Sequence, residues 1–354
     1  MSASAAAIRI GVSTSLDAPA SRQLWRPLLD WAGVRGMYCD PRWLAALCRG
    51  LRHKPYVLEA IQDGEIVGIL PLAFMRSLLF GRFLVSLPYV NWAGVVARTP
   101  DAAAALIDRA VRLADELDVR FLELRHTARC EHPALGREMT SKVQMRLPLS
   151  SSTDAVWKQL RSVVRTQVRK GEKQDFAVEW GRENLLGDFY GVFAENMRDL
   201  GTPVYGRRLF ASVLSELPRE VEFCVVRSGR QPIGGALVVH GPGLTEVPSA
   251  SVLRSFRSTA ANSLMYWRIV QRAVERGQGF FDFGRSTPGG GTFEFKKKWG
   301  AQPEPAVWQY YVRKGDAGDM RPETGKYRRF IAAWQRMPVW LTRLIGPAIV
   351  RGIP

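Results

Sequence analysis

The sequence has little cysteine and little histidine, and the few that it has are scattered. Its 354 residues include four of each, and no Cys-x-x-Cys pair occurs. This spacing excludes a disulfide scaffold and suits a reducing compartment. His126, Cys130 and His132 form an H-x-x-x-C-x-H cluster, but no fourth ligand follows at a recognisable spacing, so we predict no metal site.

Motifs of several large enzyme classes are also absent. No Gly-x-Gly-x-x-Gly run supports a dinucleotide site, and no Gly-x-Ser-x-Gly elbow supports serine-hydrolase chemistry. The glycine-rich run at 288–291 lacks the Gly-Lys-Ser/Thr end of a phosphate-binding loop. A hinge or a lid fits this run better.

Long apolar runs are missing too. No stretch of eighteen apolar residues occurs, so we expect no membrane-spanning helix. The first residues lack the charged and apolar regions of a signal peptide. We therefore expect a cytoplasmic protein, with peripheral contact on the inner face of the membrane left open.

Acidic residues are outnumbered, 33 against 50 lysines and arginines, which gives a formal net charge of +17. A field of this size favours anionic partners such as nucleic acid, phosphorylated substrates or anionic lipid. The hydrophobic fraction of 46% is that of a folded chain.

One order of elements occurs twice. A strand, a glycine turn and a second strand lead into a helix and then an aromatic-led strand, at 56–126 and again at 221–286. The turn glycines Gly64 and Gly229 lie 165 residues apart, and the strand acids Glu123 and Asp282 lie 159 apart. We predict a duplicated α/β unit in which these two acids occupy equivalent positions.

A basic segment joins the two copies. The spacing predicts one helix from Ser152 or Thr153 to about Gly171. Cations recur on it at intervals of three and four, and an apolar stripe runs beside them. A solvated face and contact with a polyanion are both open interpretations of the cations, which are Lys158, Arg161, Arg165, Arg169 and Lys173.

These features, together with "FEFKKKWG" and "FDFGRST", resemble the FemAB-like branch of the GCN5-related N-acetyltransferase (GNAT) superfamily. Within it, the chain is most similar to FemAB-related proteins of exosortase/PEP-CTERM exopolysaccharide systems. The resemblance implies two GNAT-like domains, at 1–148 and 149–315, each a mixed, largely antiparallel sheet flanked by helices. Residues 316–354 would form a basic amphipathic tail.

By the same resemblance, Phe295 and Lys296 match the family's late Phe-Lys motif, with Trp299 where Phe is usual. Lys296 would stabilise the oxyanion as an amine attacks the acyl carbon. We expect "FEFKKKWG" to form a strand, with Lys296 and Lys298 on one face and Lys297 on the other.

Asp282 has two interpretations. Its carboxylate either takes the proton from the attacking amine or caps the turn that follows. Arg285 is a candidate for an anionic group, since its guanidinium is bidentate. Arg198, Asp199 and Tyr205 crowd around a Gly-x-Pro turn, and we predict that they bind the acceptor; a plain turn between helices is the alternative.

The donor is also open. Arg257 matches the first position of the family's CoA-binding loop, but Ala260 and Asn262 replace its two glycines. This departure favours aminoacyl-tRNA, whereas the exopolysaccharide resemblance favours acyl-CoA. We expect no tightly bound cofactor, and either donor would be a co-substrate.

The tail interleaves tryptophan with basic residues. Seven lysines and arginines stand against one acid in 321–354, and Pro338 should interrupt its helix. Two interpretations are open: a helix on an anionic membrane, or one that docks on the core by its apolar side.

We therefore expect a FemAB-like transferase that forms an amide on an amine-bearing cell-envelope or exopolysaccharide precursor. An anionic partner, either tRNA or a sugar linked to a nucleotide or lipid phosphate, would supply the donor or the acceptor. The alternative is a non-catalytic, membrane-associated binding protein of a polysaccharide assembly system.

Overall fold

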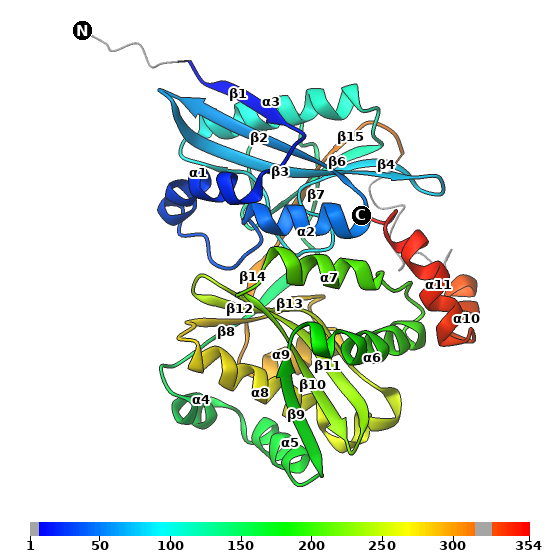
Figure 1. Ribbon diagram of the computed structural model, residues 1–354. Helices are drawn as coiled ribbons and strands as arrows, with labels where there is room; N and C mark the ends of the chain where they lie inside the picture. The colour runs from blue at the N-terminus through cyan, green and yellow to red at the C-terminus, as the bar shows by residue number, and fades with distance from the viewer. Residues whose placement is uncertain (1–6, 316–327) are drawn as a thin grey trace.

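The computed structural model describes residues 7–315 and 328–354, which form two stacked α/β units (Figure 1). The first sheet has the strand order β1-β2-β3-β4-β6-β15-β7, with β5 pairing β3. Its strands are β1 (Arg9–Ser13), β2 (Lys54–Gln62), β3 (Glu65–Ser77), β4 (Gly81–Val85), β5 (Val96–Ala97), β6 (Phe121–His126), β7 (Arg137–Met139) and β15 (Val307–Val312).

The second sheet has the order β9-β10-β11-β12-β13-β8-β14. Its strands are β8 (Val143–Pro148), β9 (Phe176–Gly181), β10 (Val221–Ser228), β11 (Gln231–Gly241), β12 (Leu244–Val252), β13 (Phe280–Ser286) and β14 (Gln302–Pro305). In both sheets the fourth and fifth strands are parallel, and the other neighbours in that order are antiparallel.

The register confirms the predicted duplication. Glu123 on β6 lies opposite Val85 of its parallel neighbour, and Asp282 on β13 lies opposite Glu246 of its own. Across the antiparallel edge, Glu123 faces Tyr310 and Asp282 faces Arg146. The two acids therefore occupy equivalent strand positions.

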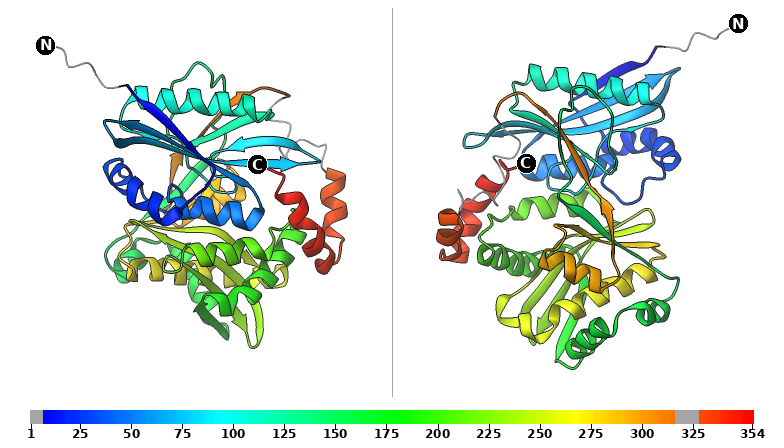
Figure 2. Two further views of the ribbon diagram at one scale, coloured as in Figure 1. Left: turned by 45° about the horizontal axis from the view of Figure 1, so that its top comes forward. Right: turned by 180° about the vertical axis from the view of Figure 1, so that it is seen from behind.

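The chain enters and leaves the second unit through strands that complete the two sheets. The sixth strand of the second sheet is β8, which precedes that unit, and the sixth strand of the first sheet is β15, which follows it. Figure 2 shows β15, in orange, rising from the lower unit into the upper sheet. The predicted divisions at 148/149 and 315/316 stay predictions, but one cut in the chain does not separate the two sheets.

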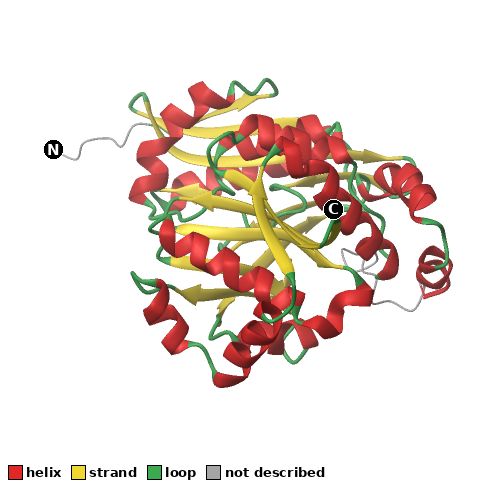
Figure 3. Ribbon diagram, turned by 60° about the horizontal axis from the view of Figure 1, so that its bottom comes forward, coloured by secondary structure: helices red, strands yellow, loops and turns green. Residues whose placement is uncertain are grey.

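Helices cover both sheets (Figure 3). In the first unit they are α1 (Ala18–Trp31), α2 (Pro41–Leu51) and α3 (Pro100–Glu116). The rest are α4 (Thr153–Gln159), α5 (Ser162–Glu172), α6 (Leu186–Asp199), α7 (Arg207–Glu216), α8 (Ala261–Glu275), α9 (Gly291–Lys298), α10 (Arg328–Gln335) and α11 (Val339–Val350), with short 3₁₀ turns at Glu183–Leu185 and Arg254–Thr259.

Local sequence explains why several elements begin where they do. Thr99 caps α3 by accepting a hydrogen bond from the Ala102 amide, and Pro100 follows at the first helical position. The β2–β3 turn has positive φ at both Asp63 and Gly64, which is the geometry that suits the twist of a hairpin.

The two units share one hydrophobic core. Helices α2 and α7 meet so closely that a side chain added at Gly50 would lie 2.7 Å from the Leu209 Cα. Trp25 and Trp43 of the first unit belong to the same buried cluster as Phe189 and Phe210 of the second. This shared core fixes the orientation of the two sheets, and so brings residues of both to one site.

Two predictions about local structure are wrong. The basic segment is two helices, α4 and α5, because Leu160 and Arg161 adopt extended ψ angles of 140° and 148°. The "FEFKKKWG" segment is helix α9 rather than a strand, with Gly290 as its N-cap. There the Phe293 and Phe295 side chains pack into an aromatic core together with Trp299, which outweighs the strand-like alternation of the sequence.

Helices α10 and α11, the described part of the tail, dock on the core. Trp334 is fully buried, Arg343 lies over the Tyr190 ring, and the Arg198 guanidinium donates to the Met337 carbonyl. The predicted tail residues 316–327 lie outside the described part of the chain. In the described ranges, no helix is both long and apolar enough to cross a membrane.

Candidate active site

A pair of buried carboxyl groups lies where β12 and β13 stop pairing. The two parallel strands share three residue pairs, which end at Glu246 and Asp282. Glu246 is fully buried and Asp282 is 1% exposed. Two carboxylates so close together in an apolar setting disfavour each other's charge.

The surroundings of Asp282 supply three donors. The Gly284 amide donates to Oδ1 at 2.6 Å, while the Gln144 side chain and the Arg146 Nε donate to Oδ2. The first bond is the turn cap that was one of the two interpretations of this residue. Burial nevertheless raises the pKa of Asp282, although Arg146 and the three hydrogen bonds oppose the shift.

Glu246 is less well satisfied. Its Oε2 accepts from the Met37 amide at 3.3 Å, whereas Oε1 is buried with no hydrogen-bond partner among residues 7–315 and 328–354. Burial and the nearby Asp282 charge raise the pKa of Glu246 well above its ordinary value, so we assign it the neutral form. Together the two groups can hold one proton between them.

Lys296 reaches this region from α9. It is 8% exposed, and its Nζ donates to the Gly284 and Arg285 carbonyls at 3.0 and 2.9 Å. Burial lowers its pKa to about 8. Two of the three N–H groups of the cation are engaged, so one is left for an incoming oxygen. By contrast, Lys297 and Lys298 are both exposed, so the predicted pairing of Lys296 with Lys298 on one face is wrong.

A stack of two arginines on one indole borders the site. The Arg285 and Arg125 guanidiniums lie 3.7 and 4.0 Å from the Trp308 ring centre. Arg125 is neutralised by Glu123, whose Oε1 lies 2.6 Å from its Nε. Burial and the Arg125 charge lower the pKa of Arg285 to about 10, and in the described ranges no carboxylate forms an ion pair with its guanidinium. It remains our candidate for an anionic group.

The other predicted substrate residues do not converge on the acids. Arg198 pairs with Asp199 at 2.7 Å and also donates to the tail. Tyr205 is half-buried, 5.2 Å from the Tyr89 ring, and burial raises its pKa to about 12. Phe295 packs against Tyr266, Phe283 and Trp299, so its ring belongs to the core.

Arg257 lies before the N-terminus of α8. Its Nη2 donates to the Asn196 side chain, which in turn donates to Ser251 on β12. Ala260 has a φ of 65°, the left-handed conformation that glycine favours. The backbone therefore adopts a glycine-like geometry at this position despite the alanine. The Thr259 hydroxyl accepts from the Ala261 amide, the first of the helix, at 3.4 Å. Among the described residues, no side chain accepts from the next two amides of α8, those of Asn262 and Ser263.

The five cations predicted to bind a polyanion lie on α4 and α5 and beside them, on the outside of the second unit. Four are exposed and Arg165 is half-buried. Throughout 7–315 and 328–354, none of the five forms an ion pair with a carboxylate. Contact with a polyanion stays a prediction. The described part of the chain also holds no group of three or more His, Cys, Asp or Glu suited to a metal ion.

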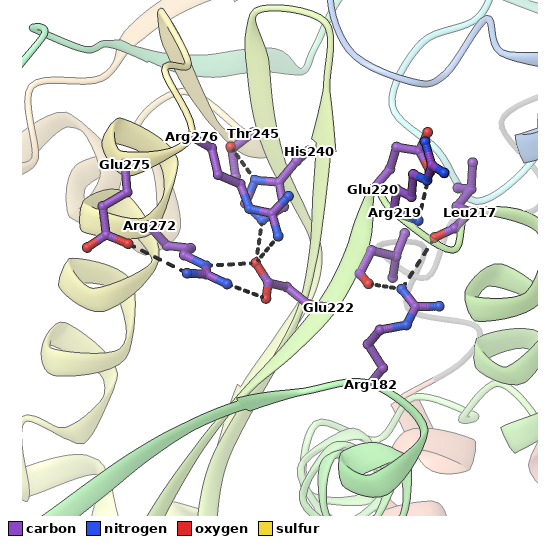
Figure 4. A network of polar contacts seen from close by, with 11 residues as sticks. Arg182, Leu217, Arg219, Glu220, Glu222, His240, Thr245, Arg272, Glu275 and Arg276 are labelled. Atoms are coloured by element: carbon purple, nitrogen blue, oxygen red, sulfur yellow. Dashed lines mark hydrogen bonds and ion pairs between the residues drawn. The ribbon is translucent and has the colours of Figure 1, made fainter.

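A second buried polar network fixes α8 against the sheet (Figure 4). Glu222 on β10 accepts from His240 at 2.9 Å and from Arg272 and Arg276 at 3.0 Å each. Burial alone would raise the pKa of Glu222, but these bonds and charges hold it at about 2. Because every member has a partner, we assign the network a structural role. A cavity of about 400 Å³ beside it, between α5, β9 and α8, contains none of the residues that border the acid pair.

Sequence reasoning missed Glu246, Gln144 and Arg146. An acid inside the apolar strand "LTEVPSASV" resembles the pattern that singled out Glu123 and Asp282, so Glu246 could have been found. Nothing local distinguishes Arg146. It faces Asp282 only because β8 joins the second sheet.

One family model matches part of the chain. Residues 158–297 match the family model of the acetyltransferase (GNAT) domain, a span that includes Glu246, Asp282 and Lys296. No curated protein matches the chain significantly.

Several solved structures have the same fold. The crystal structure of FemX superposes with a TM-score of 0.60 at 15% identity, over 82% of this chain and 93% of that one. L-PGS from Bacillus licheniformis gives 0.55 at 13% identity, over 92% and 96%. A tandem GNAT protein from the clavulanic acid biosynthesis pathway gives 0.56 at 12% identity, over 88% and 100%. The fold is therefore a tandem of two GNAT-like units, and the acid pair lies in the span that matches the acetyltransferase domain.

Proposed function

We propose that the protein is an N-acyltransferase whose second unit joins an activated acyl group to an amine. The observation that carries the proposal is the buried Glu246–Asp282 pair beside Lys296, at the point where parallel strands β12 and β13 part. These residues lie within the span that matches the acetyltransferase domain.

Each group has a distinct task in this proposal. Asp282, with its pKa raised by burial, takes the proton that leaves the attacking amine. Neutral Glu246 keeps the pair at a single negative charge. The cationic Lys296 donates its free N–H to the oxyanion of the tetrahedral intermediate.

For the donor we propose acyl-CoA ahead of aminoacyl-tRNA. A helix N-terminus binds phosphate. The Ala261 amide donates to the Thr259 hydroxyl, but among the described residues no side chain accepts from the Asn262 or Ser263 amide. Arg257 lies one turn before the helix, where its guanidinium would contact the same phosphate as the helix amides. The conformation of Ala260 supports this choice. Alanine at this position argued against a CoA-binding loop, but its backbone adopts the left-handed φ that glycine favours.

We propose an amine on a cell-envelope or exopolysaccharide precursor as the acceptor. Arg285 would bind an anionic group of it, since this half-buried side chain has no acidic ion-pair partner among the described residues. The support is the resemblance to FemAB-related proteins together with the likeness of fold to FemX.

The test is to incubate the purified protein with labelled acyl-CoAs and labelled aminoacyl-tRNAs, with and without an aminosugar acceptor. We expect transfer or slow hydrolysis of acyl-CoA, and its loss in Asp282→Asn. Turnover of aminoacyl-tRNA alone would reassign the donor. Binding of a polysaccharide with no turnover of either donor would instead support the non-catalytic alternative.

A further inference from the structure

The four most exposed large hydrophobic side chains in the described residues belong to two segments. Leu78 and Leu79 form the tip of the β3–β4 hairpin and are 107% and 74% exposed. Trp340 and Leu344 on α11 are 67% and 71% exposed. We call these four residues the apolar rim.

The two segments lie side by side although they are about 260 residues apart. A side chain added at Gly352, just after α11, would lie 2.5 Å from the Ser77 hydroxyl. The Tyr89 hydroxyl also donates to the Arg351 carbonyl at 2.9 Å. Figures 1 and 2 both place the hairpin tip on the side of the molecule where α10 and α11 lie.

The packing of α11 against the core determines which of its side chains face outward. Thr342, Gly346 and Val350 are buried at intervals of four, and Gly346 packs against the Val204 backbone. Trp340 and Leu344 are also four apart and project from the opposite side of the helix. The core therefore holds both apolar side chains on the outside.

Arginines surround the apolar rim. Arg76 and Arg82 are register partners across the hairpin and flank the two leucines in the chain. Both are exposed, and Arg82 lies 3.9 Å from Asp118 at the surface. Residues 328–354 carry five arginines and no acid. Exposed leucine and tryptophan framed by cations suit the boundary between water and an anionic bilayer, where indole and guanidinium groups lie near the lipid headgroups.

We propose that the apolar rim and its arginines bind the surface of a membrane that contains anionic lipid. Leu78, Leu79, Trp340 and Leu344 enter the boundary of the acyl region, and the arginines contact phosphate. This contact is separate from the proposed acyl transfer, because none of these residues borders the acid pair.

Vesicle sedimentation tests the proposal without any assay of activity. The full chain is mixed with phosphatidylcholine vesicles, with or without phosphatidylglycerol, and the bound fraction is measured. We expect binding to the anionic vesicles only, and its decline as salt is raised. Each double change, Leu78→Ser/Leu79→Ser or Trp340→Ser/Leu344→Ser, should weaken partitioning roughly tenfold or more.

The matched control is Leu24→Ser/Trp31→Ser on α1, where a leucine and a tryptophan are 60% and 58% exposed. It should bind vesicles as the unchanged protein does. The proposal is overturned if the unchanged protein ignores anionic vesicles, if the control loses as much binding, or if both rim variants bind normally. It is also overturned if the rim changes only convert a dimer to a monomer, which would make the surface a contact between two copies. Unchanged melting temperatures would show that all variants are folded.

Discussion

The two units hold an acid at the same strand position, but the partners of the two carboxyl groups differ. In the first unit, Glu123 is neutralised by Arg125 at 2.6 Å, and the chain after β4 closes over β6 through the bonds Ser86 N to Glu123 O and Ala93 N to Arg125 O. In the second, Asp282 accepts from Arg146 at 3.3 Å but also lies opposite another carboxyl group, that of Glu246, whose Oε1 has no hydrogen-bond partner among the described residues.

This difference indicates how a duplicated fold divides its tasks. An acid with its own buried arginine stabilises the structure around it but has little capacity to accept a proton. A carboxyl pair that shares one charge keeps that capacity, at a cost in stability. We therefore expect changes in the second unit to affect turnover, and equivalent changes in the first to affect folding.

The largest expected effect is on turnover in Asp282→Asn. Loss of a general base typically slows a reaction about 100- to 10,000-fold, while the amide keeps the shape of the site. The measurement is kcat with the acyl donor that the labelled-donor experiment selects. Glu123→Gln is the matched change in the first unit and should leave kcat within about twofold. An equal loss of kcat in both variants would contradict a catalytic role confined to the second unit.

The next effect concerns Lys296, which has no counterpart at the end of β6. Lys296→Ala should lower kcat about 100- to 1000-fold, the usual cost of one oxyanion donor. Lys297→Ala removes the same charge from an exposed neighbour and should leave kcat nearly unchanged. If the two variants lose the same activity, the lysines act only through their general charge.

In the first unit the expected effect is on stability. Glu123→Gln leaves the buried Arg125 cation unpaired, which should lower the free energy of unfolding by about 3 kcal/mol. Urea unfolding at pH 7 measures this. Asp282→Asn weakens the contact with Arg146 but also removes one of two competing acids, and an amide oxygen can still accept from Gly284. It should therefore destabilise the protein less, and a larger loss there would reverse the comparison.

A pH profile sharpens the role of Lys296. Since burial lowers its pKa to about 8, the cation is present below that pH and is lost above it. With saturating substrates, kcat should fall above about pH 8, approaching tenfold per pH unit. Lys296→Arg keeps its charge and should remove the fall, even if its overall rate is lower. A wild-type rate that still rises at pH 9 would contradict a cationic role.

The smallest effect tests the start of helix α8. Ala260 holds a left-handed φ of 65°, which costs an L-residue about 1 kcal/mol. Ala260→Gly should raise the free energy of unfolding by somewhat less, since glycine loses more entropy on folding. It should also leave donor affinity unchanged or improved, measured by calorimetry with acyl-CoA. A loss of stability would mean that the alanine side chain contributes more packing than its conformation costs.

Much of the fold could be predicted from the sequence. Period-two alternation, the turn glycines Gly64 and Gly229, and the matched acids were enough to predict the duplication and the equivalence of Glu123 and Asp282. These are local features, and the fold repeats them because each copy forms the same hairpin, helix and central strand.

Only the tertiary structure decided which groups meet. Glu246 accepts from the Met37 amide across 209 residues, and Arg146 reaches Asp282 because β8 crosses into the second sheet. The three lysines of "FEFKKKWG" are alike in sequence, and the choice among them came from α9 packing its aromatic side chains inward with Trp299. Helix and strand patterns fix which residues share a face. Which face is buried, and against what, depends on contacts between distant segments that no local pattern contains.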